Sequence, residues 1–360
     1  MSVLLLILEF IVALGLLLFL HELGHFIAAR IFHIEVEEFG FGYPPRLLKL
    51  FRIGNTDYTL NLIPFGAFVR MKGEEDPEVA GGFSSSKPLK KVIVLLSGPL
   101  MNLITGILLF SIIFSQTGAP DFKSVEVVDV SQNSPAYISG IMPGDIILKI
   151  NDVEINSMDL LANTIQDNLG NPISITYERD GFQNTITSTP RIDPPEGEGS
   201  LGIVMTNPIR DISVVEAVPF GFMVTYEQAK QLIELPGKLI LNEVSPEEAR
   251  FVGPVGIFNI YQDARSRDIE TNQSPEDSEL PAVNTLWIMA IISVALGLFN
   301  LLPVPALDGG RILFILPELL FRKKVPSRYE NAFHFFGFII LILLMFYITA
   351  QDIINPIILP

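Results

Sequence analysis

Long apolar runs dominate the pattern of hydrophobic and polar positions along this chain. Four of them cover about residues 3–30, 92–114, 284–302 and 335–350, and each is close to the ~20 residues with which an α-helix crosses a membrane. The first run lacks a basic start and is too long for a cleaved signal peptide. The pattern therefore predicts four transmembrane helices.

A shorter stretch after the first run alternates between apolar and polar residues, as β-strands do. This alternation covers residues 56–72 on both sides of Pro64-Phe65-Gly66, which predicts a β-hairpin with its tip at that turn. Gly40 to Pro45 should break the helix that precedes it. From the pattern alone, this is an ordinary cytoplasmic hairpin.

The segment 122–193 predicts a soluble α+β domain. It combines expected strands at 125–130, 173–177 and 184–188 with an expected helix near 158–168. Turn-forming residues separate these elements, as they do in small folded domains.

Residues 194–282 connect this domain to the third apolar run. Pro, Gly and Glu in 194–200 predict a linker, and the moderately apolar 212–241, interrupted by two prolines, predicts amphipathic helices on the membrane surface. Ser245 to Glu248 predicts a helix start. The acidic and polar residues 263–281 predict a loop.

Together these elements predict a polytopic α-helical membrane protein with about four transmembrane helices and an inserted α+β domain. The expected parts are an N-terminal membrane core at 1–116, the inserted domain at 122–193, a linker with amphipathic juxtamembrane helices at 194–282, and a C-terminal membrane core at 283–360.

Charge sets the expected orientation in the membrane. The net charge of −16 resides in residues 117–282, which hold ten basic and twenty-six acidic residues. Basic residues instead gather near the ends of the apolar runs, in 26–91 and 308–334, and the positive-inside rule places such segments in the cytoplasm. Both termini and the inserted domain are then extracytoplasmic.

Composition also excludes some chemistry. The 360 residues include no Cys, so neither disulfides nor thiolate zinc ligands are available. The sequence has no phosphate-binding loop and no basic aromatic patch, so we expect no nucleic-acid partner.

Candidate chemistry lies in the first apolar run, in the HExxH motif His21-Glu22-Leu23-Gly24-His25. Residues four apart lie on one face of a helix, so His21 and His25 can share a metal ion. In such motifs the Glu is the general base that acts on a zinc-bound water. A chance match is the alternative, but two of the four His of the chain fall here. A Glu inside a membrane span is also energetically costly, so a functional role is its default interpretation.

A catalytic zinc site needs a third protein ligand, for which Asp308 is the candidate. It ends the apolar segment Asn300-Leu301-Leu302-Pro303-Val304-Pro305-Ala306-Leu307-Asp308 and precedes two glycines. The prolines cannot continue a regular helix and the glycines permit close backbone approach, which predicts a broken, re-entrant turn. A plain loop at a membrane exit is the alternative.

Other polar residues within or beside the apolar runs have less defined roles. Glu9 lies ~18 Å along the helix from the motif, so we expect it to face the bundle or snorkel. Arg311 either pairs with a carboxylate or lies at the interface, where we also expect His33 and His334. Asn102 either packs against neighbouring helices or faces the substrate.

HExxH in the first run and NxxPxxxLDG in the third together resemble the motifs of the site-2 protease family. The order of parts is most similar to the bacterial regulator of sigma-E protease branch, with Gly98-Pro99-Leu100-Met101-Asn102 and Gly253-Pro254-Val255-Gly256-Ile257 in support.

The resemblance implies specific roles for the residues of these motifs. His21, His25 and Asp308 would hold one zinc ion, and Glu22 would be the catalytic base. Asn300 would hold the substrate backbone near the metal, and Pro303 and Asn102 are further candidate substrate contacts.

The resemblance also implies roles for the two β-rich parts. The hairpin at 56–72 would be membrane-associated, beside the zinc, and would pair with an extended substrate strand. Residues 122–193 resemble a bacterial, circularly permuted PDZ domain, with a peptide groove between 125–130 and 158–168. The sequence has no clear GLGF-like loop before Val125, so a size-exclusion cap that binds no peptide is the alternative.

The implied activity is that of a zinc metalloendopeptidase in regulated intramembrane proteolysis. Its substrates would be single-span membrane proteins such as anti-sigma factors, or remnant signal peptides, after an upstream site-1-type protease has removed the outer domain. The chain would lie in the bacterial inner membrane with its active site near the cytoplasmic side. The alternative from another class is an inactive PDZ-bearing scaffold with a structural zinc, although structural sites use four protein ligands.

Overall fold

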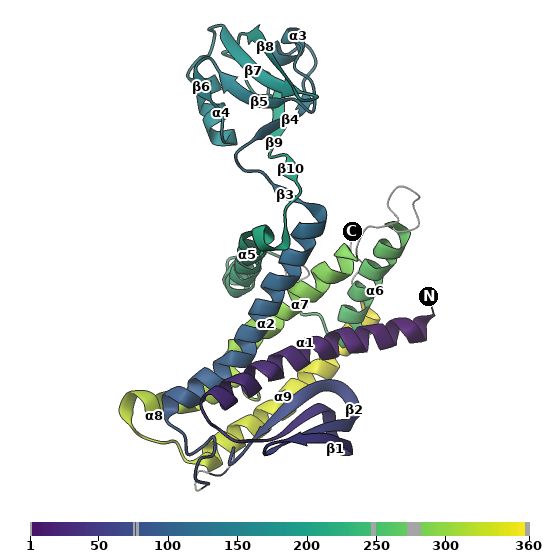
Figure 1. Ribbon diagram of the computed structural model, residues 1–360, viewed down its shortest axis with the longest axis vertical. Coiled ribbons are helices and arrows are strands. Elements are labelled where there is room, and N and C mark those ends of the chain that lie inside the picture. The colour runs from purple at the N-terminus through teal and green to yellow at the C-terminus, as the bar shows by residue number, and fades with distance from the viewer. Residues whose placement is uncertain (1, 75, 77–78, 246–249, 272–281, 357–360) are drawn as a thin grey trace. The chain divides into compact units, whose positions relative to one another are not determined.

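The computed structural model describes residues 2–74, 76, 79–245, 250–271 and 282–356, and the helix start expected at 245–248 lies mostly outside them. The chain forms two compact units (Figure 1). Unit 1 combines Met1–Gln116 with Val214–Pro360, and unit 2, Thr117–Ser213, is inserted between them.

Four helices of unit 1 are long and apolar enough to cross a membrane: α1 (Val3–Ile31), α2 (Pro88–Thr117), α7 (Val283–Leu301) and α9 (Ser327–Ile354). They coincide with the four expected helices, although α9 begins well before residue 335. Large apolar side chains along α1 and α9 are exposed, as they are in helices whose outer faces contact lipid. The chain therefore has the architecture of a multi-pass membrane protein.

Unit 1 has three further helices among its described residues. α5 (Val214–Ile240) is a single helix with two prolines inside it, where we expected several, because a proline removes one hydrogen bond and can bend a helix without ending it. α6 (Pro254–Thr271) includes the first part of the loop expected at 263–281, and the rest of that loop, 272–281, lies outside the described residues. α8 (Asp308–Phe321) follows a non-helical turn after α7.

The expected hairpin is present but is much longer than the sequence pattern indicated. β1 (Val36–Ile53) and β2 (Thr56–Met71) are antiparallel, and Gly54-Asn55 joins them. The tip expected at 64–66 is therefore wrong. A Gly-Asn pair between two strands is a recognised hairpin turn, and Gly54 has the positive φ of 61° that such turns favour.

Positive-φ glycines bend both strands instead of ending them. Gly42 in β1 and Gly66 in β2 have φ of 76° and 73°, a conformation that costs glycine little. The segment 40–45 therefore lies inside β1, and α1 ends earlier, at Ile31. The bent strands align as four segments in the order 46–53, 56–61, 36–41 and 67–71, so that 67–71 forms one edge of this sheet.

Aromatic side chains hold the sheet against α1. The ring of Phe19 lies 5.4 Å from that of Phe39 and 5.2 Å from that of Phe41, between centroids. Phe26 lies 5.2 Å from Phe39. Each such pair contributes about 0.5–1.5 kcal/mol beyond the burial of its area. The sheet is thereby fixed beside the HExxH segment of α1.

Unit 2 is an α+β domain on one antiparallel sheet of order β8-β7-β5-β4-β9, with β6 paired to β5. Residues of α3 (Pro135–Ser139) and α4 (Met158–Gln166) share one buried apolar core with the sheet. The strands are β4 (Val125–Val130), β5 (Ile146–Ile150), β6 (Val153–Glu154), β7 (Ile173–Arg179), β8 (Phe182–Ser188) and β9 (Ile203–Thr206), and a separate ladder joins β3 (Ala119–Pro120) to β10 (Ile209–Arg210).

Strand β9 changes two expectations about this domain. It lies beyond the expected domain end at residue 193, which is too early because the sheet takes its last strand from 203–206. β4 pairs with β5 on one side and β9 on the other, so the groove expected beside 125–130 has no free strand edge. Among the described strands, β8 and β9 form the two edges of the sheet, and β9 is the one beside β4.

Candidate metal centre

The HExxH motif lies within α1, where it faces α2 across an unusually close contact. His21 and His25 are one helical turn apart, with their Nε2 atoms 3.2 Å from each other. A Cβ added at Gly98 of α2 would lie under 3.0 Å from Nε2 of both imidazoles, and one at Gly24 would lie under 3.0 Å from the carbonyl oxygen of Ser97. The two glycines therefore make room for the imidazoles between the helices.

Asp308 reaches the same point from a folded loop, residues 302–307, which we call the metal loop. A Cβ added at Gly309 would lie under 3.0 Å from the carbonyl oxygens of Leu301 and Leu302, and one at Gly310 under 3.0 Å from that of Val304. Only glycine permits this return of the chain onto itself. The broken turn predicted from the prolines and glycines is confirmed, and it starts α8 at Asp308.

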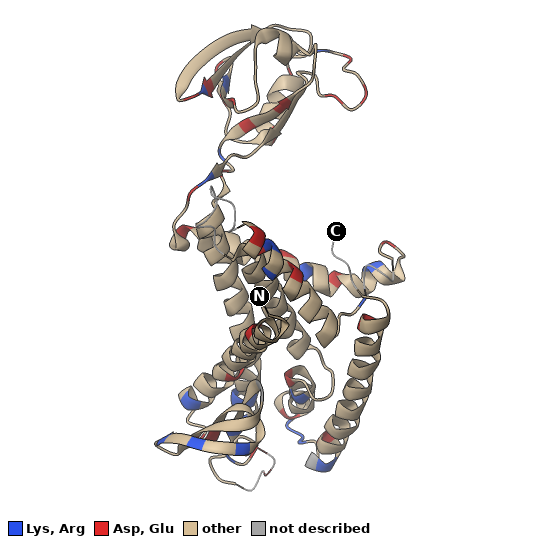
Figure 2. Cartoon of the chain, turned by 90° about the vertical axis from the view of Figure 1, so that its right-hand side faces the viewer, with Lys and Arg blue, Asp and Glu red and all other residues tan. Residues whose placement is uncertain are grey.

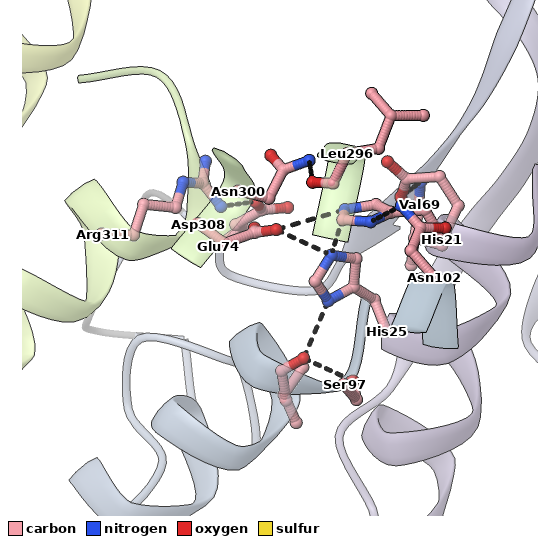
Figure 3. Close-up of polar contacts among 12 residues, drawn as sticks. His21, His25, Val69, Glu74, Ser97, Asn102, Leu296, Asn300, Asp308 and Arg311 are labelled. Carbon is pink, nitrogen blue, oxygen red and sulfur yellow. Dashed lines mark hydrogen bonds and ion pairs between the residues drawn. The ribbon is translucent and has the colours of Figure 1, made fainter. Parts of the chain in front are cut away.

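The three side chains converge in a geometry that fits one tetrahedral cation (Figure 3). Oδ2 of Asp308 lies 3.2 Å from Nε2 of His21 and 3.4 Å from Nε2 of His25. Two ligands of a tetrahedral zinc ion, each ~2.0–2.1 Å from the metal, lie about 3.3 Å apart. In the described part of the chain, Oδ2 of Asp308 is also buried without a hydrogen-bond partner, as is expected of a carboxylate oxygen that binds a metal.

Two contacts from α2 orient the imidazoles. Nδ1 of His25 lies 2.7 Å from the carbonyl oxygen of Val94, so it carries the proton and donates it there. The side-chain amide of Asn102 lies 3.2 Å from Nδ1 of His21. The contact of His25 leaves its Nε2 unprotonated and free to bind a metal, in the way that outer hydrogen bonds commonly fix metal-binding His. For His21 the same result requires the Asn102 amide to turn its Oδ1, which has no partner among the described residues, toward the Nδ1–H.

Asn102 itself is fully buried, and its backbone oxygen accepts a hydrogen bond from Ser293. This placement does not fit the expected substrate contact, because a side chain enclosed between helices cannot meet an incoming chain. It fits a residue that orients His21.

Glu22 connects the motif to the sheet. Its Oε2 accepts a hydrogen bond of 3.1 Å from the backbone N–H of Val69 in β2. Val69 belongs to the edge segment 67–71. One carboxylate oxygen is therefore anchored, and the strand edge of the sheet lies against the residue that we expect to be the base.

The two other expected substrate contacts lie near the end of α7. The amide nitrogen of Asn300 donates to the carbonyl oxygen of Leu296 at 2.9 Å, within its own helix. Pro303 is exposed in the metal loop. Both residues come shortly before Asp308 in the sequence, and neither belongs to the set of candidate ligands.

Several supporting residues could not be assigned from the sequence. His334, expected at the interface, accepts a hydrogen bond of 2.9 Å from the N–H of Ala306 in the metal loop. Arg311 forms an ion pair with Glu74. Glu9 faces the bundle, where Arg265 lies 2.9 Å from its Oε1. Each pairing joins distant parts of the chain, so that no local pattern signals it.

A His/His/Asp set with both imidazoles buried and an adjacent Glu on the HExxH helix is typical of the class of mononuclear metallopeptidases. The sequence profile described as Peptidase family M50 matches residues 9–344. The chain therefore belongs to peptidase family M50, that of the site-2 proteases. The expected family, the zinc cofactor and the class of zinc metalloprotease are confirmed.

Curated relatives match the chain over nearly its full length. A Clostridium perfringens protein named as a zinc metalloprotease is 33% identical over 348 residues, which cover 96% of this chain and 98% of the relative. Zinc metalloprotease RasP from Shouchella clausii is 27% identical over 431 aligned positions, covering 96% and 98%. Among solved structures, a PDZ domain of an SdrC-like protein from Listeria monocytogenes covers 23% of this chain and 88% of its own, with 20% identity and a TM-score of 0.21.

Proposed function

We propose that this protein is an intramembrane endopeptidase in which His21, His25 and Asp308 hold the zinc ion and Glu22 is the general base. The observation that carries the proposal is the position of this ligand set. Two ligands and the base belong to a helix apolar enough to span a membrane, and the ligand atoms lie within 4.8 Å of one another. A polar centre of this kind inside a membrane helix indicates a functional site.

The roles of the protein groups follow from their contacts. A zinc ion bound here would supply a Lewis acid that lowers the pKa of water to about 7 and polarises the scissile carbonyl. Glu22 is anchored through Oε2 by Val69 and would accept the proton of the attacking water on its other oxygen. It then passes that proton to the leaving nitrogen.

The edge segment 67–71 would receive the substrate. A peptide bond in a helix hides its carbonyl in hydrogen bonds, so the substrate span must unwind before water can attack. The N–H groups of Val69 and Met71 on this edge already donate to Glu22 and Glu74, so the edge would offer its remaining backbone groups to the unwound segment by β-augmentation. Asn300 and Pro303, which come shortly before Asp308 in the sequence, would position the same segment.

Charge supports the orientation that we propose for the chain in a bacterial inner membrane. Figure 2 shows Lys and Arg along the hairpin sheet, and basic residues also flank the spans in 308–334. The positive-inside rule places these parts in the cytoplasm. The termini and the acidic unit 2 are then extracytoplasmic, and the metal centre is nearer the cytoplasmic side.

Unit 2 would be a PDZ-type domain whose peptide site lies at β9 instead of β4. β9 is the edge strand beside β4, and Leu201-Gly202-Ile203 leads into it. This segment resembles the loop that the sequence lacks before Val125. Leu161 of α4 lines a small cavity together with Leu201 and Ile203. A size-exclusion cap without peptide binding is the other candidate role for this unit.

The substrates would be single-span membrane proteins of the anti-sigma-factor type and remnant signal peptides. The acidic outer unit would disfavour intact bulky outer domains, so an upstream site-1-type protease would make the first cut. The biological result would be regulated intramembrane proteolysis that releases a cytoplasmic fragment.

The test compares zinc content and cleavage in purified variants. Glu22→Gln should keep about one zinc per chain and lose at least ~100-fold in cleavage of a model single-span substrate, because it removes the base and no ligand. Asp308→Ala should lose zinc as well as cleavage. Glu227→Gln, on an exposed part of α5, is the control and should change neither.

An inactive scaffold with a structural zinc remains the second candidate. It would require four protein ligands, whereas the described residues offer three at this point. Wild-type protein that binds zinc but never cleaves a substrate already shortened to a single span would favour the scaffold.

A further inference from the structure

A second polar space lies behind the metal loop. It is a cavity of 560 Å³, within the range of about 300–1,000 Å³ that is usual for ligand pockets. Its lining comes from the loop after β2, from α2, from α8 and from α9. It shares a wall with the metal centre, because Arg311 lies one turn after Asp308 on α8 and His334 accepts the hydrogen bond of Ala306. Figure 3 shows Arg311 and Glu74 near Asp308.

The basic residues that line this cavity already have carboxylate partners. Nζ of Lys91 lies 2.6 Å from Oε2 of Glu318, and their side chains are 9% and 13% exposed. Lys324 lies 3.5 Å from the other oxygen of Glu318. Arg311 pairs with Glu74. Among the described residues, each Lys and Arg of the lining thus has a carboxylate partner.

Two polar side chains of α9 in the cavity, Glu330 and His334, have no such direct partner among the described residues. Glu330 lines the cavity and forms no ion pair or hydrogen bond among the described side chains, and the positive charges of Arg311 and Lys91 act on it only from beyond ion-pair distance. Nδ1 of His334 accepts from Ala306 and so carries no proton, which places the proton of the neutral ring on Nε2. That Nε2 is buried and has no partner in the described part of the chain. The two residues are four apart, so they share one helix face.

We propose that this cavity binds a Lys or Arg side chain from the cytoplasmic flank of the substrate span, with Glu330 as the receiving carboxylate. The Nε2–H of His334 then donates to a backbone carbonyl of the same flank. The substrate cation gives Glu330 an ion-pair partner, and the substrate carbonyl gives the Nε2–H of His334 an acceptor. The cavity lies beside the loop that holds Asp308, so a bound flank also fixes which peptide bond reaches the metal.

This inference rests on the proposed function, because it assumes that a membrane span is cleaved with its basic flank toward the cytoplasm. Membrane proteins carry Lys and Arg on that flank as a rule. A carboxylate in a partly buried cavity would recognise this basic flank without requiring a particular sequence. Charge pairs between two binding partners improve discrimination between substrates more than overall affinity.

The test measures a preference in detergent, where substrate orientation in a membrane plays no part. Three model substrates differ only in the flank, which carries Lys, Gln or Glu. The wild type should cleave the Lys substrate about five- to tenfold faster than the Gln substrate in kcat/KM. In Glu330→Gln this ratio should fall to about one, and in Glu330→Lys the Glu substrate should become preferred over the Lys substrate. A wild-type ratio near one, or an unchanged ratio in Glu330→Gln, overturns the proposal.

A binding measurement separates this proposal from the proposed catalysis. Because the chain has no Cys, Asn331→Cys places a single thiol in the cavity lining. In the Glu22→Gln background, the Lys-flanked substrate should slow maleimide labelling of this thiol, and the Gln-flanked substrate should not. Adding Glu330→Gln should abolish the protection. Protection without any wild-type cleavage would contradict the proposed activity alone, and labelling that no substrate slows would contradict the cavity.

Discussion

The two imidazoles of the metal centre lie against a residue without a side chain, Gly98 of α2. A Cβ there would lie under 3.0 Å from Nε2 of His21 and of His25, the two atoms that would bind the metal. Such a distance is too short for any contact, so one imidazole would have to turn away. The glycine of the Gly-Pro-Leu-Met-Asn motif is therefore explained by the metal centre as well as by helix packing.

Gly98→Ala should weaken zinc binding by at least about tenfold, because misplacing an outer contact of a metal ligand typically costs 10- to 100-fold in affinity. Zinc per chain after dialysis against a graded chelator, measured by mass spectrometry, checks this. Gly237→Ala is the matched control, since its added Cβ has no neighbour within 4 Å. Equal zinc retention in Gly98→Ala and Gly237→Ala would show that the imidazoles do not need this space.

The residues that could be predicted from the sequence are those whose chemistry follows from short spacing. His21, Glu22 and His25 follow from one turn of helix, and Asp308 follows from a loop that cannot be helical. Val94 and His334 could not be predicted. One acts through a backbone oxygen that every residue has, and the other depends on how α9 packs on the metal loop.

Among the helices, α6 is fixed to its neighbours by buried carboxylates. Asp352 near the end of α9 is 1% exposed and accepts a hydrogen bond of 2.9 Å from the N–H of Gly256 in the first turn of α6. Arg250 lies 2.9 Å from its other oxygen. A Cβ at Gly253 would lie 2.7 Å from Asp352 Oδ2, so the Gly-Pro-Val-Gly-Ile motif makes room for this carboxylate.

Asp352→Ala should lower stability by about 3 kcal/mol, because it leaves the charge of Arg250 and the N–H of Gly256 without their partner. The melting temperature in detergent should fall clearly, while zinc content of the folded fraction stays the same. Glu227→Ala, which removes an exposed carboxylate of α5, should leave the melting temperature unchanged. An unchanged melting temperature in Asp352→Ala would mean that the carboxylate does not hold α6.

The elements themselves were predictable to different degrees, for physical reasons. Spans α1, α2, α7 and α9 follow from the length of apolar runs, which the membrane dictates. The extent of the hairpin does not follow from the alternation of apolar and polar residues. Gly42 and Gly66 bend β1 and β2 without ending them, whereas the local pattern predicts that a strand ends at each. β9 was missed because a four-residue strand after a Pro- and Gly-rich linker has no distinctive pattern.

At the scale of the whole molecule, unit 2 is an insertion whose two ends meet. Ala119 pairs with Arg210, and Pro120 with Ile209, so the chain enters and leaves unit 2 at neighbouring points. Unit 2 also has its own buried core, separate from those of unit 1. Removal of residues 121–208 with a short Gly-Ser linker should therefore leave unit 1 folded.

This deletion should retain about one zinc per chain, because all three proposed ligands belong to unit 1. It also separates the two roles considered for unit 2. If unit 2 excludes bulky substrates, the deletion variant should cleave a single-span substrate with its outer domain intact, which the wild type leaves uncut. If the edge of β9 captures a peptide, the variant should instead show a raised KM for a substrate that bears an extended outer peptide, with kcat little changed. Loss of zinc on deletion would contradict the independence of the two units on which both expectations depend.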